Sequence, residues 1–299
     1  MSKGYATIEK ERRRLQQIFV VPLALSILVL VMLPMVSLFG ISFTSLNFSK
    51  KSTSFVGLES YVNLLTDESF INAVTNTIVM LVGTVGLQMV LGIIIALVIH
   101  KTKFLNGFIR TLILLPMIMP PIIVGIMWRI MLMPKYGGFN VMLQQLGFTP
   151  PDWLGEPGYA MLTIILAAVW EWTPFVVLFI LAGLEGLPAS PYEAIKIDGA
   201  NWLQEIWYLT LPLLKPIIGV VVVFRIIEGL KIFPLVFSLT EGGPGSSTEE
   251  ITFYVYKQGF SYLRLGYASA AAMLVFGLMF LAIFLAMKYG NRKKTSSVS

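Results

Sequence analysis

The sequence has no cysteine and only one histidine, His100. The chain therefore has no means of forming disulfides or thiolates, and a single histidine cannot build a histidine metal site. Charged residues are also scarce, at 13% of the 299 residues, compared with about 25% in a typical soluble domain. These shortages argue against a disulfide-stabilised domain and a cysteine-dependent enzyme. We expect the chain to bind no metal or cofactor of its own.

Hydrophobic residues, by contrast, make up 56% of the chain. A bilayer core about 30 Å thick requires about 20 apolar residues in a helix, and several stretches are long enough. Helices are expected because lipid cannot hydrogen-bond an exposed backbone, and no segment shows the alternation of a membrane barrel. We predict an all-α membrane protein with six transmembrane helices, at residues 18–43, 73–99, 108–133, 159–183, 211–237 and 267–289.

Lysine and arginine are unevenly distributed between the two ends of these helices. Fourteen lie around the two termini and in the loops after the second and fourth helices, whereas five lie on the other side. The positive-inside rule assigns the richer side to the cytoplasm. We therefore expect both termini to be cytoplasmic, and the net charge of +6 reflects topology rather than nucleic-acid binding.

The predicted helices leave no segment long enough for a separate soluble domain. We expect a cytoplasmic segment at residues 1–17, a membrane domain at 18–289 and a cytoplasmic tail at 290–299. The first apolar run lacks an Ala-x-Ala-like cleavage site, so we interpret it as a retained helix rather than a signal peptide. A short surface helix is expected near residues 58–65, in the first external loop.

No phosphate-binding motif of the GxxxxGK[ST] type is present. The glycine-rich run that begins at Gly242 lacks the required lysine and follows no soluble strand. We therefore do not expect this chain to hydrolyse ATP, and any ATPase must be a separate chain.

The cytoplasmic loop at residues 187–216 contains two helix signals separated by glycine. Ser190 is expected to be an N-cap, with proline at the first helical position and Glu193 completing a capping box. Gly199 can end this helix in the left-handed conformation. Residues 201–208 are expected to form a second short amphipathic helix, so the loop should form a helix–glycine–helix elbow.

Two interpretations of the elbow differ in what covers it. An amphipathic connector could simply lie on the membrane surface. However, Glu193, Asp198 and Glu205 outnumber Lys196 and Lys215, and an anionic lipid surface does not favour that balance. A protein partner accounts for the acidic residues better.

Charged residues inside the predicted helices indicate either a polar path or an internal ion-pair network. A charge at the bilayer centre costs about 2.5–3.5 kcal/mol on insertion scales, so it usually faces a bundle interior or a water-filled cavity. Arg225, Glu228 and Lys231 are spaced by three residues and can share a helix face, and Glu171 lies in the fourth helix. Arg129, near a helix end, could instead snorkel. The residues alone leave both interpretations open.

The fourth predicted helix also contains aromatic residues, Trp170, Trp172 and Phe175, around Glu171. Aromatic rings stack on the C–H faces of sugars, and carboxylates and guanidinium groups hydrogen-bond to hydroxyls. Tryptophan also packs helices and forms belts at membrane interfaces. The position in mid-helix argues against a belt but not against packing.

The elbow carries a specific motif. Its Glu-Ala, Asp-Gly-Ala and Leu-Pro elements resemble the EAA loop of ABC-importer permeases, in which this loop is the coupling helix that docks into a cleft on the cytoplasmic ATPase. One position departs from the pattern, because Ile195 replaces the usual second alanine. The resemblance implies ATPase coupling by Glu193, Ala194, Asp198, Gly199, Ala200, Leu211 and Pro212.

Two further runs, WEWTPF at residues 170–175 and LTEGGPG at residues 239–245, are similar to the carbohydrate branch of that family. This branch includes maltose-type and glycerol-phosphate-type permeases. Most of the sugar-contacting identities of the maltose-type subunit differ here, so maltose itself is not implied. By resemblance, the substrate path comprises Glu171, Trp172, Phe175, Arg225, Glu228, Gly229 and Ile232.

The resemblance implies a permease subunit of an ATP-binding-cassette importer, which forms half of the path for a sugar, oligosaccharide or polyol. Implied partners are a second permease, two cytoplasmic ATPases that bind ATP and Mg²⁺, and an extracytoplasmic solute-binding protein that docks near residues 240–247. The expected location is a prokaryotic cell (inner) membrane. The chain is expected to be a transport subunit and not an enzyme.

Two other classes stay open on the residues alone. A secondary carrier could use the intramembrane charges for ion coupling, although we detect no internal repeat. An integral membrane enzyme requires a convergent set of catalytic groups, and we identify none. Dependence on ATP held by a separate chain distinguishes the importer from the carrier, and substrate turnover would identify the enzyme.

Overall fold

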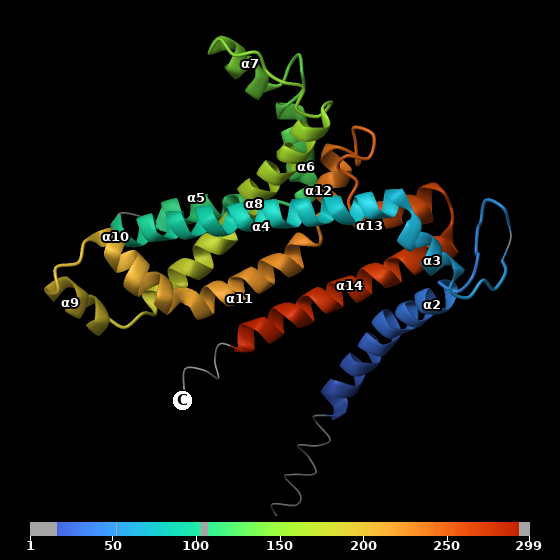
Figure 1. Ribbon diagram of the computed structural model, residues 1–299, viewed down its shortest axis with the longest axis horizontal. Coiled ribbons are helices and arrows are strands. Elements are labelled where there is room, and N and C mark those ends of the chain that lie inside the picture. Colours follow the sequence, from blue (N-terminus) through green and yellow to red (C-terminus); the bar gives the residue numbers. More distant parts are fainter. Residues whose placement is uncertain (1–16, 52, 103–106, 293–299) are drawn as a thin grey trace, which may run out of the picture. The chain divides into compact units, whose positions relative to one another are not determined.

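The computed structural model describes residues 17–51, 53–102 and 107–292 (Figure 1). Every regular element in these ranges is a helix, apart from one isolated bridge between Thr44 and Phe55. The prediction of an all-α protein is therefore confirmed. Most of the expected N-terminal segment and of the C-terminal tail, with their lysines and arginines, lies outside the described residues.

Helices of two kinds alternate along the chain, long apolar ones and short ones that connect them. The short surface helix expected in the first external loop is present as α3. The bounds are η1 (Leu28–Met32, a π-helix), α2 (Leu33–Ile41), α3 (Glu59–Thr66), α4 (Glu68–Thr102), α5 (Gly107–Ile118), α6 (Pro121–Met131), α7 (Gly138–Gln145), α8 (Pro157–Glu185), α9 (Ser190–Ile197), α10 (Trp202–Gln204), η2 (Glu205–Thr210), α11 (Leu211–Gly229), α12 (Phe233–Leu239), α13 (Ile251–Tyr256), η3 (Lys257–Ser261) and α14 (Leu265–Arg292).

Four continuous helices in the described part of the chain are long and apolar enough to cross a bilayer, and a bent pair makes up to five. The four are Gln17–Ile41, Glu68–Thr102, Pro157–Glu185 and Trp202–Gly229. A shorter apolar stretch, Leu265–Leu281, lies within α14. The finding supports a multi-pass membrane protein.

Two of the predicted helices are broken. The third, expected as one helix at residues 108–133, divides into α5 and α6, which meet at an angle of 105°. Pro120 and Pro121 cause the break, because proline disfavours helical backbone in the residue before it and lacks an amide hydrogen. The fifth, expected at residues 211–237, starts earlier at Trp202 and ends at Gly229, with α12 as a separate helix.

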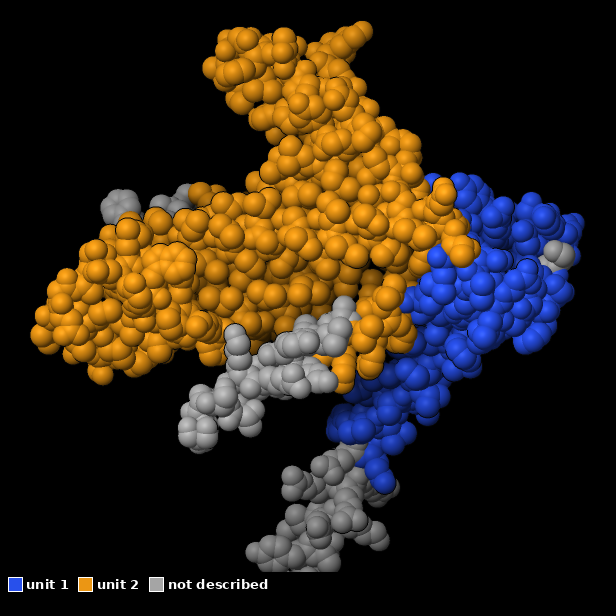
Figure 2. All heavy atoms as spheres, in the orientation of Figure 1, with its two compact units in different colours: residues 1–65, 255–274 blue, residues 66–254, 275–299 orange. Residues whose placement is uncertain are grey.

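The chain divides into two compact units (Figure 2). The first combines residues 1–65 with 255–274, and the second combines residues 66–254 with 275–299. Within the first unit, the amide of Gly266 donates to the carbonyl of Leu46 at 2.9 Å. A Cβ atom at Gly266 would lie 1.9 Å from the carbonyl oxygen of Thr44, so the absence of a side chain permits this contact.

The core of the second unit is built on α4 and α8, which lie side by side. A Cβ atom at Gly92 of α4 would lie 2.5 Å from Cγ1 of Val176 in α8. Glycine therefore lets the two helices approach closely, as small residues do in membrane bundles. Val176 and Ile180 of α8 are fully buried in the apolar cluster around this contact, and this packing positions the polar face of α8.

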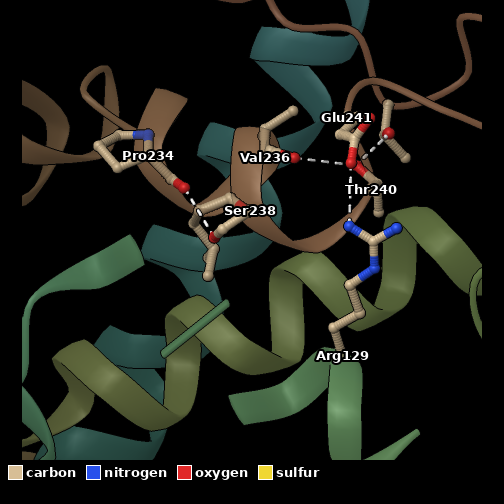
Figure 3. A network of polar contacts seen from close by, with 8 residues as sticks. Arg129, Pro234, Val236, Ser238, Thr240 and Glu241 are labelled. Atoms are coloured by element: carbon tan, nitrogen blue, oxygen red, sulfur yellow. Dashed lines mark hydrogen bonds and ion pairs between the residues drawn. The ribbon is translucent and has the colours of Figure 1, made fainter. Parts of the chain in front are cut away.

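Helix α12 packs closely against α6, and one ion pair links the residues near their ends (Figure 3). Ser238 donates through Oγ to the carbonyl of Pro234 at 2.8 Å, and a Cβ at Gly125 of α6 would meet that hydroxyl at 1.9 Å. Arg129 donates through Nη1 to Oε1 of Glu241 at 3.0 Å. Arg129, for which snorkelling was one possibility, thus forms an exposed ion pair near the end of α6.

Candidate functional site

A cavity of about 230 Å³ lies within the second unit. Its lining brings together α4, α6, α8, α11 and α12, and six of the seven residues predicted for the substrate path belong to it. The lining residues are Thr84, Pro121, Ala168, Glu171, Trp172, Arg225, Glu228, Gly229, Lys231, Ile232, Pro234 and Leu235. The seventh predicted residue, Phe175, is not part of the lining.

Arg225 is the best-anchored charge of the cavity, with only 2% of its surface exposed. Its Nε donates to Oε1 of Gln88 at 2.9 Å. Its Cζ lies 4.8 Å from the ring centre of Trp172 and 5.9 Å from that of Phe175. These distances are within the range of cation–π attraction, so Phe175 contacts the guanidinium group without being part of the cavity lining.

Gln88 is a site residue that the sequence argument missed. It is fully buried in α4 and links three helices, because its Nε2 also donates to the carbonyl of Ala168 in α8 at 2.9 Å. A signal for it existed in the sequence, since an uncharged polar side chain in mid-membrane is also unusual.

Glu171 faces the cavity from α8 and is 1% exposed. Its Oε1 atom and the Nη1 atom of Arg225 are both buried without a hydrogen-bond partner among the described residues. Buried polar atoms are nearly always hydrogen-bonded. Two opposite, unsatisfied groups beside one cavity therefore indicate a place where a polar molecule binds.

Glu228 and Lys231 make the ion pair of this region. Nζ of Lys231 lies 2.8 Å from Oε1 of Glu228. The two residues are three positions apart and face each other as predicted, although Lys231 lies beyond the end of α11. Arg225 donates to Gln88 and Glu228 accepts from Lys231, while Glu228 and Glu171 both attract the guanidinium group of Arg225 electrostatically.

The elbow has the predicted order of helix, glycine and helix. Gly199 follows α9 with φ of +76°, a left-handed conformation that favours glycine. Tyr192 donates its hydroxyl to Oγ1 of Thr210 at 3.1 Å, and this bond ties α9 to the start of the next long helix. The predicted second short helix is instead continuous with α11, through α10 and η2.

The helix caps of the elbow differ from the prediction. Ser190 lies inside α9, Ala189 occupies the N-cap position, and no side chain caps that end. The capping box occurs at the second helix, where Asn201 accepts from the amide of Gln204 at 2.9 Å and Gln204 accepts from the amide of Asn201 at 2.8 Å. The helix therefore begins one residue earlier than predicted, and Ser190 lies one position past the N-cap.

The residues predicted to couple to an ATPase lie along this elbow, and most are exposed. Glu193, Ala194, Asp198, Gly199 and Pro212 are exposed, whereas Ala200 and Leu211 are half-buried. The neighbouring apolar residue Ile197 is 86% exposed. Trp202, Leu203 and Trp207 of the elbow are exposed as well, and several exposed apolar side chains on one segment are typical of an interaction surface.

The loop after α12 is anchored to α4. The Nδ2 amide of Asn76 donates to the carbonyls of Ser246 and Glu249, both at 3.0 Å. The neighbouring Glu250 is fully buried and accepts from the amides of Thr252 and Phe253. Burial raises the pKa of Glu250, although these hydrogen bonds oppose the shift. The part of this loop expected to receive a binding protein, residues 240–247, is therefore held firmly.

Within the described residues, no group of three or more His, Asp or Glu side chains is placed to hold a metal ion. The arrangement can instead bind a polar solute in the cavity and a protein at the elbow. The two places lie at opposite ends of α11, since Leu211 and Pro212 begin that helix and Arg225, Glu228 and Gly229 end it.

Comparisons with known proteins agree with this geometry. Residues 88–295 match the family described as "Binding-protein-dependent transport system inner membrane component". A trehalose/maltose transport system permease protein of Thermococcus litoralis is 34% identical, over 94% of this chain and 95% of the relative. A sulfoquinovosyl glycerol transport system permease protein of Agrobacterium fabrum is 33% identical, over 89% and 87%.

A solved structure is also similar over nearly the full length. It is a chain of a bacterial alginate ABC transporter in complex with alginate pentasaccharide-bound periplasmic protein. The TM-score is 0.82 and the identity 25%, with 95% of this chain and 96% of that chain covered.

Proposed function

Because the chain belongs to the family of binding-protein-dependent transport system inner membrane components, we propose that it supplies half of the path by which an ATP-driven importer moves a carbohydrate or polyol. The observation that carries the proposal is the cavity, which combines Trp172 with the unsatisfied groups of Glu171 and Arg225. Such a combination suits a ligand with C–H faces and hydroxyl groups. The named substrates of the relatives support this class.

The proposed topology has six membrane crossings with both termini in the cytoplasm. In addition to the four long helices, the bent pair α5 and α6 would make one broken crossing and α14 the sixth. The excess of lysine and arginine at the cytoplasmic ends supports this orientation. The cell membrane would be a prokaryotic inner membrane.

The proposed coupling device is the elbow. Docked on a cytoplasmic ATPase that binds ATP and Mg²⁺, it would transmit nucleotide-driven movement through α11 to the cavity as a rigid body. The bond between Tyr192 and Thr210 supports the stiffness that a lever needs. Glu193 and Asp198, both exposed, would contact the ATPase.

The proposed assembly contains a second permease, two ATPases and an extracytoplasmic solute-binding protein. The chain itself would bind neither ATP nor Mg²⁺. The anchored loop at residues 240–247 would contribute to the dock of the binding protein, because a firmly held loop loses little entropy on binding.

Co-purification tests this assembly. The chain is expressed with its operon partners, purified in mild detergent, and its bound subunits are identified by mass spectrometry. We expect two ATPases and a second permease, and proteoliposomes of the complex with its binding protein should take up a saccharide only when ATP is supplied.

A matched pair of variants separates coupling from general damage. Gly199 and Gly147 both have positive φ, +76° and +83°, with open space where a Cβ would lie. Gly199→Val and Gly147→Val therefore impose a similar backbone strain of about 1–2 kcal/mol. We expect only Gly199→Val to lose the ATPases. Uptake without ATP by the native chain alone would support the secondary carrier instead.

A further inference from the structure

We infer that the cavity selects a neutral, polyhydroxylated solute over an acidic or phosphorylated one. This inference depends on the proposed import function and narrows its substrate class. It is not settled by the relatives, whose printed substrates include neutral sugars and acidic ones.

The charges of the lining balance one another. Four charged side chains line the cavity, of which Glu171 and Glu228 are acidic and Arg225 and Lys231 are basic. Glu228 and Lys231 already pair with each other at 2.8 Å. The remaining two charges are opposite in sign, so the lining has no surplus of positive charge to compensate an anion brought out of water.

Two buried side-chain atoms beside the cavity have no hydrogen-bond partner among the described residues. The Oε1 atom of Glu171 only accepts hydrogen bonds when ionised, and the Nη1 atom of Arg225 only donates them. A hydroxyl group both donates and accepts, so neighbouring hydroxyls of one solute satisfy both atoms. A phosphate or carboxylate satisfies only the guanidinium group and places a like charge beside Glu171.

The hydrogen bond to Gln88 fixes the orientation of Arg225. Its Nε–H is occupied by Oε1 of Gln88 at 2.9 Å. Bidentate hydrogen bonding of a carboxylate or phosphate through Nε and one terminal nitrogen is therefore blocked. This bidentate mode is one of the strong forms of anion recognition. Gln88 is thus a positioning residue that occupies Nε and leaves the terminal nitrogens of Arg225 to hydrogen-bond the solute.

The apolar part of the lining is consistent with the same ligand. Trp172, Ile232 and Leu235 line the cavity beside the charged groups. An indole ring stacks on the C–H face of a sugar or polyol without regard to charge. The aromatic contact therefore provides affinity, and the charged pair provides the discrimination.

Matched pairs of solutes test the inference. The complete transporter is purified in nanodiscs without its binding protein, so that the solute binds only to the membrane subunits. Equilibrium dialysis then compares glucose with glucuronate, trehalose with trehalose 6-phosphate, and glycerol with glycerol 3-phosphate. We expect the neutral member to bind at least about tenfold more tightly in every pair that binds, because the charged member meets an unpaired carboxylate.

Variants identify the source of the preference. Glu171→Gln preserves the shape and removes the negative charge, so the preference for the neutral member should fall by at least about threefold. Glu156→Gln is the matched control, since Glu156 is an exposed residue at the start of the same helix, and it should leave the ratio unchanged. The wild-type ratio tests the inference even if a variant fails to assemble.

Tighter binding of the charged members would overturn the inference, and so would an unchanged ratio in a well-assembled Glu171→Gln transporter. Absence of binding for every compound, combined with ATP-driven uptake of any of them in the presence of the binding protein, would show that the cavity is not the solute site. Absence of ATPase subunits from the purified complex, together with absence of ATP-driven uptake, would contradict the proposed function itself, and with it the inference.

Discussion

The cavity and the elbow lie at the two ends of α11 and are built in different ways. At the cavity, Arg225 is 2% exposed and is held by Gln88, a residue 137 positions away in the sequence. At the elbow, Asn201 and Gln204 cap each other across three positions, and the residues expected to contact a partner are exposed. The cavity depends on helix packing, whereas the elbow depends mainly on local backbone signals.

This difference matches the two tasks that we propose. A solute site must hold charged groups in a fixed geometry. Only a packed interior prevents these groups from becoming hydrated or forming an ion pair with each other. A coupling element must present its surface to another chain while moving as a unit. Damage to packing should therefore cost more stability at the cavity than at the elbow.

The largest expected effect is that of Gln88→Leu. The change removes the acceptor for Nε of Arg225 and leaves a buried charge without its partner, which costs about 3 kcal/mol. The free energy of unfolding of the detergent-solubilised complex should fall accordingly, and saccharide binding should be lost with it.

Gln145→Leu provides the control, because Gln145 is an exposed residue of α7. It should change the unfolding free energy by less than about 0.5 kcal/mol. Equal effects of the two substitutions would mean that the hydrogen bonds of Gln88 do not hold the cavity together.

The next effect is that of Gly92→Ala. The added Cβ would lie 2.5 Å from Cγ1 of Val176, and overpacking of this kind costs about 2 kcal/mol. Gly86→Ala in the same helix meets nothing within 4 Å and should be neutral or stabilising. Thermal unfolding measures both, and Val176→Ala should rescue Gly92→Ala if the contact is the cause.

At the elbow, Tyr192→Phe should have a smaller effect of about 1 kcal/mol. It removes the hydroxyl that bonds Oγ1 of Thr210 at 3.1 Å, and a single neutral hydrogen bond contributes about this much. Hydrogen exchange of the α9 amides should become faster. Tyr208→Phe, at a position 78% exposed, is the control, and similar exchange in both variants would show that the tyrosine hydroxyl does not hold the elbow.

The smallest effect is expected for Arg129→Gln. The pair with Glu241 has side chains 47% and 64% exposed, and exposed ion pairs contribute less than about 1 kcal/mol. The loss should shrink further at high salt because screening weakens the native pair. A loss as large as that of Gln88→Leu would contradict the contrast between packed and exposed contacts.

The sequence alone predicted the elements whose signals are local. Long apolar runs identify membrane helices because lipid cannot hydrogen-bond the backbone, so a spanning segment must satisfy its own backbone hydrogen bonds as a helix. Gly199 was predicted correctly as the end of α9, because a left-handed residue is a property of one position. The substrate path was suggested by resemblance, and six of its seven residues line one cavity.

Other features were decided by the tertiary structure. Arg225 donates its hydrogen bond to Gln88 of α4, a partner 137 positions away that only helix packing brings within reach. The side chain of Phe175 faces the guanidinium group and not the cavity for the same reason. Helical spacing predicts which residues share a face, but only helix packing determines which other residues that face contacts.

The breaks between helices are an intermediate case. The Pro120–Pro121 pair marks the break after α5, but its angle of 105° is set by the packing of α6 against α12 and α8. Local chemistry thus determined where this chain forms helices and where it turns. Contacts between distant segments determined which polar groups share the cavity, because hydrogen bonds and burial depend on distance in space and not in sequence.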